Sequence, residues 1–419
     1  MTSSPPRPRS KTKPAARPIP PVAATDSHGP AAVVAVKRLF AAETGNYFLL
    51  LGTTLFLVVF GLIMVLSSSA VESFKASGDF FNGFVRQVVF AAIGVPLMLI
   101  AARMRASFWK RWSGIFLLIA LGLQFLTVAT PLGSERGGNR NWITIGAFSG
   151  QPSEFVKLSL VIWLGYILFK KREVMDNWRE LVVPLVPIGG AAIGLVLLGG
   201  DLGTSIILTA IVMGAIFFAG VKLRFLAVPI VLIGIAGAIA ASARSSRLDR
   251  IQAFLNGCKS ADDHLGTCWQ TVHGWWALAS GGLFGSGLGN SKAKWSWLPE
   301  ADNDFIFAII GEELGLLGAI LVLALFIVLA ISFVRIIRAS SDPFARVTVS
   351  AVMVWIVGQA FVNIAVVLGV LPVLGVPLPL ISAGGSALVT TLLGIGIVLS
   401  FARHAPDAAP AIATGGRLR

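Results

Sequence analysis

Charged residues are scarce in this chain. Asp, Glu, Lys and Arg make up 13% of its 419 residues, whereas a soluble domain carries about 25%. Hydrophobic residues make up 55%. This balance excludes a soluble globular protein and predicts an integral membrane protein in which one helical bundle fills the bilayer.

Side chains that carry common enzyme chemistry are also few. The chain has four His and two Cys, which argues against a zinc centre, and the sequence contains no Ser-His-Asp arrangement or Walker motif. The Gly-rich stretch SGGLFGSGLGNS at 280–291 precedes no predicted strand. We therefore interpret it as a surface or reentrant segment with tight bends, and not as a phosphate-binding loop. ATP or a nucleotide sugar as substrate has no support.

The excess of positive charge follows a topological pattern. The formal net charge is +14, and the Lys and Arg lie mainly in the N-terminal tail and between apolar runs. This placement indicates membrane topology, with attraction to anionic lipid as a by-product, and argues against nucleic acid as a partner. Residues 1–46 are Pro-rich and basic, so we expect a disordered cytoplasmic tail that is either dispensable or docks a partner. Residues 404–419 form a second cytoplasmic tail.

Ten apolar stretches within residues 47–403 are long enough to cross about 30 Å of hydrocarbon. They run over residues 47–67, 84–102, 113–130, 153–169, 181–199, 202–220, 225–243, 303–334, 346–370 and 384–402. The sequence therefore predicts an all-α, polytopic membrane domain with about ten transmembrane helices. The eighth stretch is longer than a span needs, so it is either tilted or begins outside the membrane.

The short loops alternate in charge. Four of them are rich in Lys and Arg: 103–111, 170–179, 221–224 and 335–346. We place these loops and both termini in the cytoplasm. The other connections then face outward, and the longest of them, 244–302, lies between the seventh and eighth spans. It holds Cys258 and Cys268, which either form a disulfide in an oxidising exterior or remain free thiols.

Several polar residues gather at the predicted outer face. Glu154 and Lys157 share one face of the fourth span, either as substrate-binding residues or as an ion pair that only holds helices together. Asp201 opens the sixth span, either as a substrate-binding residue or as a helix N-cap. The other candidates for substrate binding are Arg140 in the second outer loop, Arg247 and Arg250 near the end of the seventh span, and Ser382, Gly384 and Gly385 between the last two spans.

The stretch LPEADNDFIFAIIGEELG at 298–315 concentrates acidic residues at the start of the eighth span. Asp304 stands at the membrane interface beside other acids, which raise a carboxyl pKa, and next to a long outer loop able to cover a substrate. Asp304 is therefore a candidate for a catalytic base. Glu312 and Glu313, deeper in the span, are better explained as packing or pairing residues.

Five segments together resemble a known family. LPEADNDFIFAIIGEELG, QPSEFVKL, GDLGTS, SGGLFGSGLG and GVPLPLISAGGS are similar to the signatures of the SEDS proteins (shape, elongation, division and sporulation), in the right order over residues of about 47 to 403. MVLSSSAVES, AIIGEELGLLG and the long tail resemble the division branch and an actinobacterial relative. The family motif has His-Thr where this chain has Asp302-Asn303, and its Arg-Trp pair corresponds to Arg140-Asn141-Trp142 here.

The resemblance implies a reaction that suits acids on the outer face. SEDS proteins polymerise glycan strands of peptidoglycan from lipid II, and their catalytic aspartate matches Asp304. The new bond is β-1,4, so the anomeric centre inverts while a carboxylate base takes the proton of the acceptor hydroxyl. Charge on the departing undecaprenyl pyrophosphate is offset by Arg140, Lys157, Arg247 and Arg250, or by a divalent cation, Mg²⁺ or Mn²⁺. No other cofactor is expected.

The family also implies a place in the cell. Its division members work at the septum of the plasma membrane with a class B penicillin-binding protein, a transpeptidase, and with other division proteins. Two other functions stay open from the sequence. One is a flippase for lipid II, which would place its charges near the bilayer midplane, and the other is a non-catalytic scaffold for the transpeptidase.

Overall fold

The computed structural model describes residues 44–146, 148–175, 177–222, 245–258, 266–295 and 297–403. Helices dominate this part of the chain. Eight of them are long and apolar enough to cross a membrane: α2 (Gly45–Ser77), α3 (Asn82–Arg103), α4 (Ala106–Ala129), α5 (Pro152–Lys170), α6 (Trp178–Leu198), α12 (Ile306–Ala339), the continuous unit α13 (Pro343–Met353) to α14 (Gln359–Val367), and α15 (Gly385–Ala402). The chain is thus a multi-pass membrane protein.

The helices lie at the predicted apolar stretches, with two differences in their bounds. α2 continues to Ser77, where the predicted stretch ends at 67, so much of the predicted loop 68–83 is helical, and α4 begins at Ala106, where the predicted stretch begins at 113. The predicted sixth stretch is α7 (Leu202–Phe218), a shorter apolar helix that begins beside α6 after a tight turn. The predicted seventh stretch, 225–243, and both predicted tails lie outside the described residues. The count of ten spans and the assignment of inner and outer loops therefore stay predictions.

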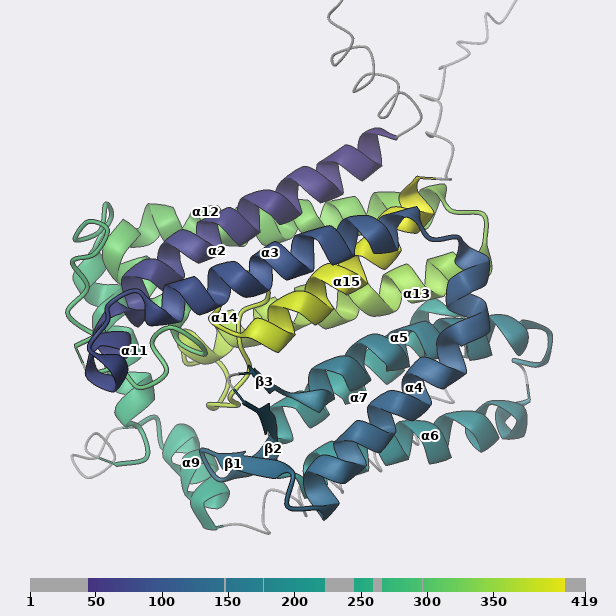
Figure 1. The fold of residues 1–419 in the computed structure, drawn as a ribbon, viewed down its shortest axis with the longest axis horizontal. Coiled ribbons are helices and arrows are strands. Elements are labelled where there is room, and N and C mark those ends of the chain that lie inside the picture. Colours follow the sequence, from purple (N-terminus) through teal and green to yellow (C-terminus); the bar gives the residue numbers. More distant parts are fainter. Residues whose placement is uncertain are drawn as a thin grey trace, which may run out of the picture. The chain divides into compact units, whose positions relative to one another are not determined.

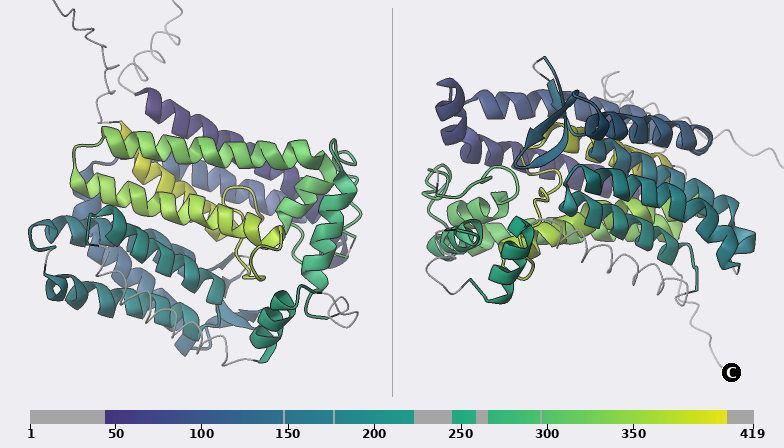
Figure 2. Two further views of the ribbon diagram at one scale, coloured as in Figure 1. Left: turned by 180° about the vertical axis from the view of Figure 1, so that it is seen from behind. Right: turned by 90° about the horizontal axis from the view of Figure 1, so that it is seen from below.

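Two groups of helices make up the described bundle. In Figure 1, α2, α3, α12 and α15 run along one group, and α4, α5, α6 and α7 along the other. α13 packs against α12 on one side and against α5 and α7 on the other, so it joins the two groups. The view from behind in Figure 2 shows the same division. The buried apolar core extends through both groups.

A break at Gly315 divides the long helix α12. Gly315 has φ of 70° and ψ of −166°, so the helix ladder is interrupted about two turns after it begins. The Gly-rich stretch after α11 (Trp269–Gly281) satisfies the backbone groups that the break releases. Ser286 and Gly287 donate their N–H to the carbonyls of Glu312 and Glu313, and Leu316 donates to the carbonyl of Gly282. Irregular backbone within a membrane protein requires such partners.

The same contact explains the Gly content of 280–291. A Cβ atom on Gly285 would meet the Glu313 carbonyl, and a Cβ atom on Gly315 would meet the backbone of Gly285 and Leu283. Both glycines also have positive φ, which L side chains rarely adopt. The tight bends expected from the sequence are therefore present.

A small antiparallel sheet occupies the loop between α4 and α5. It consists of β1 (Gly133–Arg136), β2 (Asn139–Ile145) and β3 (Phe148–Gly150), in that order. β1 and β2 pack against α4. The sequence predicts only a loop here, because strands of three to seven residues with polar ends give little periodicity.

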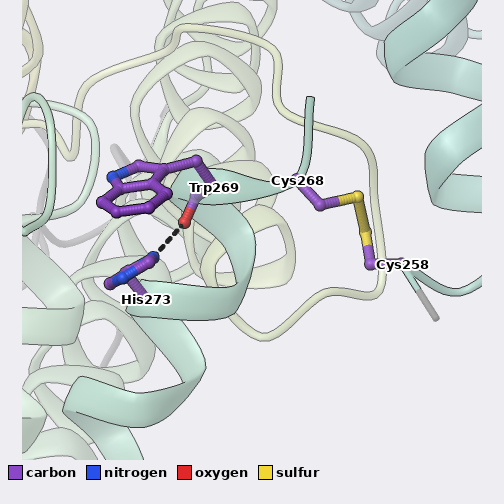
Figure 3. Close-up of a disulfide and its surroundings, with 4 residues drawn as sticks. All are labelled: Cys258, Cys268, Trp269 and His273. Carbon is purple, nitrogen blue, oxygen red and sulfur yellow. Dashed lines mark hydrogen bonds between the residues drawn. A yellow bond between two sulfur atoms is a disulfide. The ribbon is translucent and has the colours of Figure 1, made fainter. Parts of the chain in front are cut away.

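The predicted outer loop 244–302 contains two helices, α9 (Ser245–Leu255) and α11. Cys258 and Cys268 form a disulfide, and Cys268 is the N-cap residue of α11 (Figure 3). Trp269 follows directly, and its ring stacks on His273, whose Nδ1 lies 2.8 Å from the Trp269 carbonyl oxygen. The disulfide is therefore a local staple at the start of α11.

Candidate active site

Two loops meet where α12 begins. One is the segment 298–305, which carries the acidic motif, and the other is 371–384, between α14 and α15. Ala383 donates its N–H to the carbonyl of Asp302 (2.8 Å), and the hydroxyl of Ser382 donates to the carbonyl of Asn303 (2.6 Å). Ser382 Oγ also accepts the N–H of Leu378 (2.8 Å), so this side chain closes its own loop and joins it to the other.

Two amide side chains of α14 bind the backbone of these loops. Asn363 Nδ2 donates to the carbonyls of Asp304 and Val376, each at 2.7 Å. Gln359, one turn earlier, donates from Nε2 to the carbonyl of Pro377 (2.9 Å). A π-helical turn, Val354–Gly358, comes immediately before these residues. Such turns shift the angular position of the residues that follow and often occur at functional sites.

The carboxylate of Asp304 has no neutralising partner among the described residues. Its Oδ1 is buried and has no hydrogen-bond partner in this part of the chain. Its Oδ2 faces Gly375: a Cβ atom added to this glycine would lie 3.7 Å from that oxygen, and Gly375 has a φ of 70°. Burial raises the pKa of Asp304 to about 7, and the charges of Glu300, Asp201 and Asp302 act in the same direction. A carboxyl group with such a pKa exchanges protons readily at neutral pH.

Asp302, the acidic substitution in the family motif, has a related environment. Burial raises its pKa to about 7, with contributions from the charges of Glu72 and Glu300. Its backbone carbonyl accepts the N–H of Ala383, as described above. Asp302 therefore shares the electrostatic environment of Asp304. The two differ in their backbone contacts, because Asn363 donates its hydrogen bond to the backbone carbonyl of Asp304.

Glu154 and Lys157 form a buried ion pair in α5, with 2.8 Å between Oε1 and Nζ. Both side chains are at most 3% exposed. Lys157 Nζ also donates to Gln359 Oε1 (3.0 Å), so the pair is joined through Gln359 to the loop 371–384. The ion pair considered for these residues is thus present in the structure, and it supports the loop that carries the site.

Asp201 is the N-cap of α7, the second of the two roles considered for it. Its Oδ1 accepts the N–H of Thr204 (2.8 Å), and its Oδ2 accepts a hydrogen bond from Gln151 Nε2 (2.9 Å). The N–H of Gln151 in turn donates to Ser386 Oγ at the start of α15 (3.2 Å). Burial raises the pKa of Asp201, and its negative charge acts on Asp304.

The arginine candidates lie in different settings. Arg140 is exposed, and it donates from Nη2 to the carbonyl of Thr130 (2.7 Å) and from its backbone N–H to Gly199 (2.7 Å). Arg250 is exposed on α9, and no hydrogen bond or ion pair joins it to Asp304 within the described part of the chain. Arg247 lies on the same helix, and its side chain is outside the described atoms. Among the side chains that the structure describes, no hydrogen bond or ion pair joins Arg140 or Arg250 to Asp304.

The candidate residues Gly384 and Gly385 lie where α15 begins, beside α3. Gly384 donates its N–H to Gln87 Oε1 (3.2 Å), and Gln87 Nε2 donates to the Ser382 carbonyl (3.1 Å). Gly385 starts α15 at a point where a Cβ atom would meet the ring of Phe90. Gly385 therefore permits the close approach of α15 to α3, and Gly384 joins α15 to α3 through its hydrogen bond to Gln87. Among the described residues, no group of three or more His, Cys, Asp or Glu could hold a metal ion.

Glu312 and Glu313 hold the base of the loop that contains Asp304. Glu312 accepts the hydroxyl of Ser291 (2.5 Å) and the N–H of Lys292 (2.8 Å). Glu313 pairs with Lys294 (3.2 Å) and accepts the hydroxyl of Ser67 on α2 (2.6 Å). Both glutamates are almost fully buried. The segment from 291 to 313 is therefore closed at its base by charged contacts, with Asp304 inside it.

The uncharged part of this arrangement is not among the site residues predicted from the sequence. Asn363, Gln359, Gln87 and Gln151 carry the hydrogen bonds that fix the two loops, yet each is an amide in or beside an apolar helix. One signal was available. Gln359 and Asn363 are four residues apart in an apolar span, and polar groups that share a helix face in a membrane are functional candidates.

Known proteins share this fold and these motifs. A family model described as cell cycle protein, which unites FtsW, RodA and SpoVE, matches residues 47–406. Proteins described as probable peptidoglycan glycosyltransferase FtsW from Mycobacterium tuberculosis and Mycobacterium bovis are 39% identical over 370 residues, which are 88% of this chain and 70% of each relative. Stage V sporulation protein E of Bacillus subtilis is 37% identical over 363 residues, 86% of this chain and 98% of that protein.

Solved structures agree with the fold. The crystal structure of the rod shape determining protein RodA of Thermus thermophilus is 25% identical, with a TM-score of 0.63 over 85% of this chain and 96% of that one. A chain from a peptidoglycan synthase complex superposes with a TM-score of 0.69 at 23% identity, over 84% of this chain and 96% of that one.

The molecule is thus a polytopic membrane protein with a buried carboxylate between two packed loops. It belongs to the FtsW/RodA/SpoVE family. The resemblance inferred from the five motifs is confirmed, and the mycobacterial relatives agree with the expected actinobacterial affinity.

Proposed function

We propose that this chain is a peptidoglycan glycosyltransferase that extends glycan strands from lipid II, with Asp304 as the general base. The observation that carries the proposal is the Asp304 carboxylate. It has a buried oxygen without a partner among the described residues, a backbone fixed by Asn363, and a pKa of about 7. The names of the relatives support the activity.

The reaction uses these properties directly. An acceptor hydroxyl is a weak nucleophile at neutral pH, so a base must take its proton as oxygen bonds to C1 of the donor sugar. The C1–oxygen bond to the pyrophosphate breaks on the opposite side, with inversion, and undecaprenyl pyrophosphate leaves. The ionised form of Asp304 accepts the proton, and its high pKa then favours holding it.

The loops around Asp304 supply positioning. Ser382, Asn363 and Gln359 fix the backbone of both loops, so the backbone that carries the Asp304 carboxylate is in position before substrate binds. Such pre-organisation lowers the barrier, because orientation does not have to be established during the reaction. Lys157 reaches the same region through Gln359, and its charge offsets part of the surrounding acidic charge.

The proposal extends to a partner protein and a location in the cell. A class B penicillin-binding protein would crosslink the strands that this chain makes, and the fold shared with a chain of a peptidoglycan synthase complex supports such a pairing. We place the pair at the division septum of the plasma membrane. In the same proposal, Mg²⁺, Mn²⁺ or the arginines of the predicted outer loops offset the charge of the pyrophosphate. Comparing turnover with and without a chelator tests whether a divalent cation is needed.

The test is reconstitution of purified full-length protein with labelled lipid II, with and without the transpeptidase. We expect a glycan ladder from the wild type. Asp304→Asn keeps volume and hydrogen bonding but removes the base, so polymerisation should fall by about 10²–10⁴-fold in folded protein. Asp302→Asn is the matched control and should cost much less. A ladder made by folded Asp304→Asn protein at the wild-type rate would overturn the assignment and favour the flippase.

A further inference from the structure

A cavity of about 240 Å³ lies between α3, α4, α5 and α15, away from Asp304. Its lining is apolar except for the Ser159 hydroxyl and the Trp109 indole N–H, and it also includes Ile100, Met104, Phe108 and Phe116. Ile100 is more than half exposed, so the cavity reaches the surface of the bundle. A cavity with such walls stays dry and takes apolar ligands. In a bilayer the available apolar ligand is a hydrocarbon chain.

Two polar atoms in the cavity wall lack a partner among the described residues. Trp109 Nε1 and Ser159 Oγ are both buried and make no hydrogen bond within this part of the chain. Trp109 is 7% exposed and Ser159 is fully buried. A buried N–H donor without an acceptor is costly, and a ligand oxygen at this point would satisfy it. A purely hydrocarbon ligand would leave both groups unsatisfied.

The mouth of the cavity lies beside a basic loop. α3 ends at Arg103 and α4 begins at Ala106, so Trp109 stands in the first turn of α4. Arg103, Arg105 and Arg111 are exposed, and no ion pair joins them to another residue that the structure describes. The fourth cation of this loop, Lys110, is already paired with Asp342 at 2.9 Å.

We propose that this cavity binds one anionic phospholipid of the inner leaflet. An acyl chain fills the apolar cavity, an ester carbonyl accepts the Trp109 N–H, and the phosphate lies among Arg103, Arg105 and Arg111. Loop 103–111 is predicted to be cytoplasmic, and the inner leaflet is the one rich in anionic lipid. Guanidinium groups bind phosphate through paired N–H donors, which favours a phosphate head group at this loop.

The experiment measures retained lipid on the purified full-length protein by native mass spectrometry, with phosphatidylglycerol and phosphatidylcholine as probes. The wild type should retain one phosphatidylglycerol in preference to phosphatidylcholine. Each guanidinium near an anionic surface contributes roughly fivefold in affinity, so the triple variant Arg103→Gln, Arg105→Gln, Arg111→Gln should lose at least about tenfold. These side chains are exposed, so the melting temperature should stay unchanged.

A matched control removes equal charge elsewhere. Arg335→Gln, Arg338→Gln, Arg346→Gln takes three exposed cations from another short basic loop and should leave lipid retention unchanged. In the cavity, Ser159→Leu adds bulk and should reduce retention of both lipids, whereas Ser159→Ala keeps the space open and should retain most of it.

Three results would overturn the proposal. The first is equal loss of phosphatidylglycerol in the control triple, which would indicate general charge attraction. The second is unchanged retention in both the arginine triple and Ser159→Leu. The third is undecaprenyl phosphate displacing phosphatidylglycerol at equal concentration, which would assign the cavity to a polyprenyl chain.

Discussion

Asn363 and Asp304 are joined by one short hydrogen bond, from the side-chain amide of the first to the backbone carbonyl of the second, at 2.7 Å. The same amide nitrogen holds the carbonyl of Val376 at 2.7 Å. One buried side chain on α14 therefore sets the position of the proposed base relative to the loop that faces it. The carboxylate of Asp304 stays free of this bond.

Replacing Asn363 should separate positioning from folding. Asn363→Ala leaves two carbonyls without their donor, which costs about 1–3 kcal/mol each if they stay buried. A displacement of about 1 Å costs up to about 10²-fold in rate, so we expect kcat to fall at least tenfold with a smaller change in KM. Gln124→Ala is the control, because Gln124 is a buried amide paired with Asn141. Equal loss of kcat in both variants would contradict a positioning role.

The pH dependence should reveal the ionised base. Because burial and neighbouring acids raise the pKa of Asp304 to about 7, kcat/KM should fall about tenfold per pH unit below that value and level off above it. Asp302→Asn removes one of the charges that raise this pKa, so the acid limb should move to lower pH. A limb that stays in place would show that Asp302 does not act on Asp304.

The same groups affect stability with a defined sign. The folded state holds protons on Asp302 and Asp304 up to about pH 7, whereas an unfolded aspartate loses its proton near pH 3.8. Between these values the folded state binds more protons, so stability should decrease as the pH rises through this window. Thermal unfolding of Asp304→Asn protein should show a weaker dependence on pH than the wild type.

The buried pair of α5 should behave as a unit. Lys157→Met leaves Glu154 as a buried charge without its cation, which costs about 3–5 kcal/mol, so folded yield and activity should fall together. The double variant Glu154→Gln, Lys157→Met removes both charges and should recover most of the yield. If yield recovers while polymerisation does not, Lys157 acts on the substrate and its role is not only architectural.

The ion pair between Lys294 and Glu313 should contribute strongly to the stability of the folded state. Lys294→Met leaves the fully buried Glu313 without a cation, and we expect a loss of about 3–5 kcal/mol in unfolding free energy. Lys292→Met is the matched control. Its side chain is exposed, and its contact to Glu312 is made by the backbone N–H, which the variant keeps. Equal melting temperatures for the two variants would contradict the loop-closing role.

Local signals in the sequence predicted the spans and the acidic motif well. Long apolar runs locate the helices, since hydrocarbon requires every backbone group to bond within its own segment. They do not fix every helix end, because α2 continues past its apolar run to Ser77. Asp304 was identified because an acid at the start of an apolar run is costly and needs a reason. The sequence does not decide whether Asp201 binds substrate or caps a helix, because its partner Gln151 comes fifty residues earlier.

The features that the sequence did not reveal depend on distant pairs. Asn363 lies 59 residues from Asp304, and Ser382 lies 79 residues from Asn303. The break at Gly315 resembles any glycine in an apolar helix until the backbone of Gly285 is placed against it. Such pairings have no periodicity, so only the folded chain identifies them.

The break at Gly315 also determines the order in which the site can be completed during synthesis. The Gly-rich partner of the break, residues 282–287, is translated before α12, so the carbonyls of Glu312 and Glu313 find their donors as soon as this helix inserts. The donors for Asp304 and Asn303, on Asn363 and Ser382, leave the ribosome later. In a nascent chain that stops before α14, the backbone groups at the break in α12 are therefore already bonded, but the loop that carries Asp304 is not yet fixed. The proposed base takes its final position only when Asn363 and Ser382 have joined this loop.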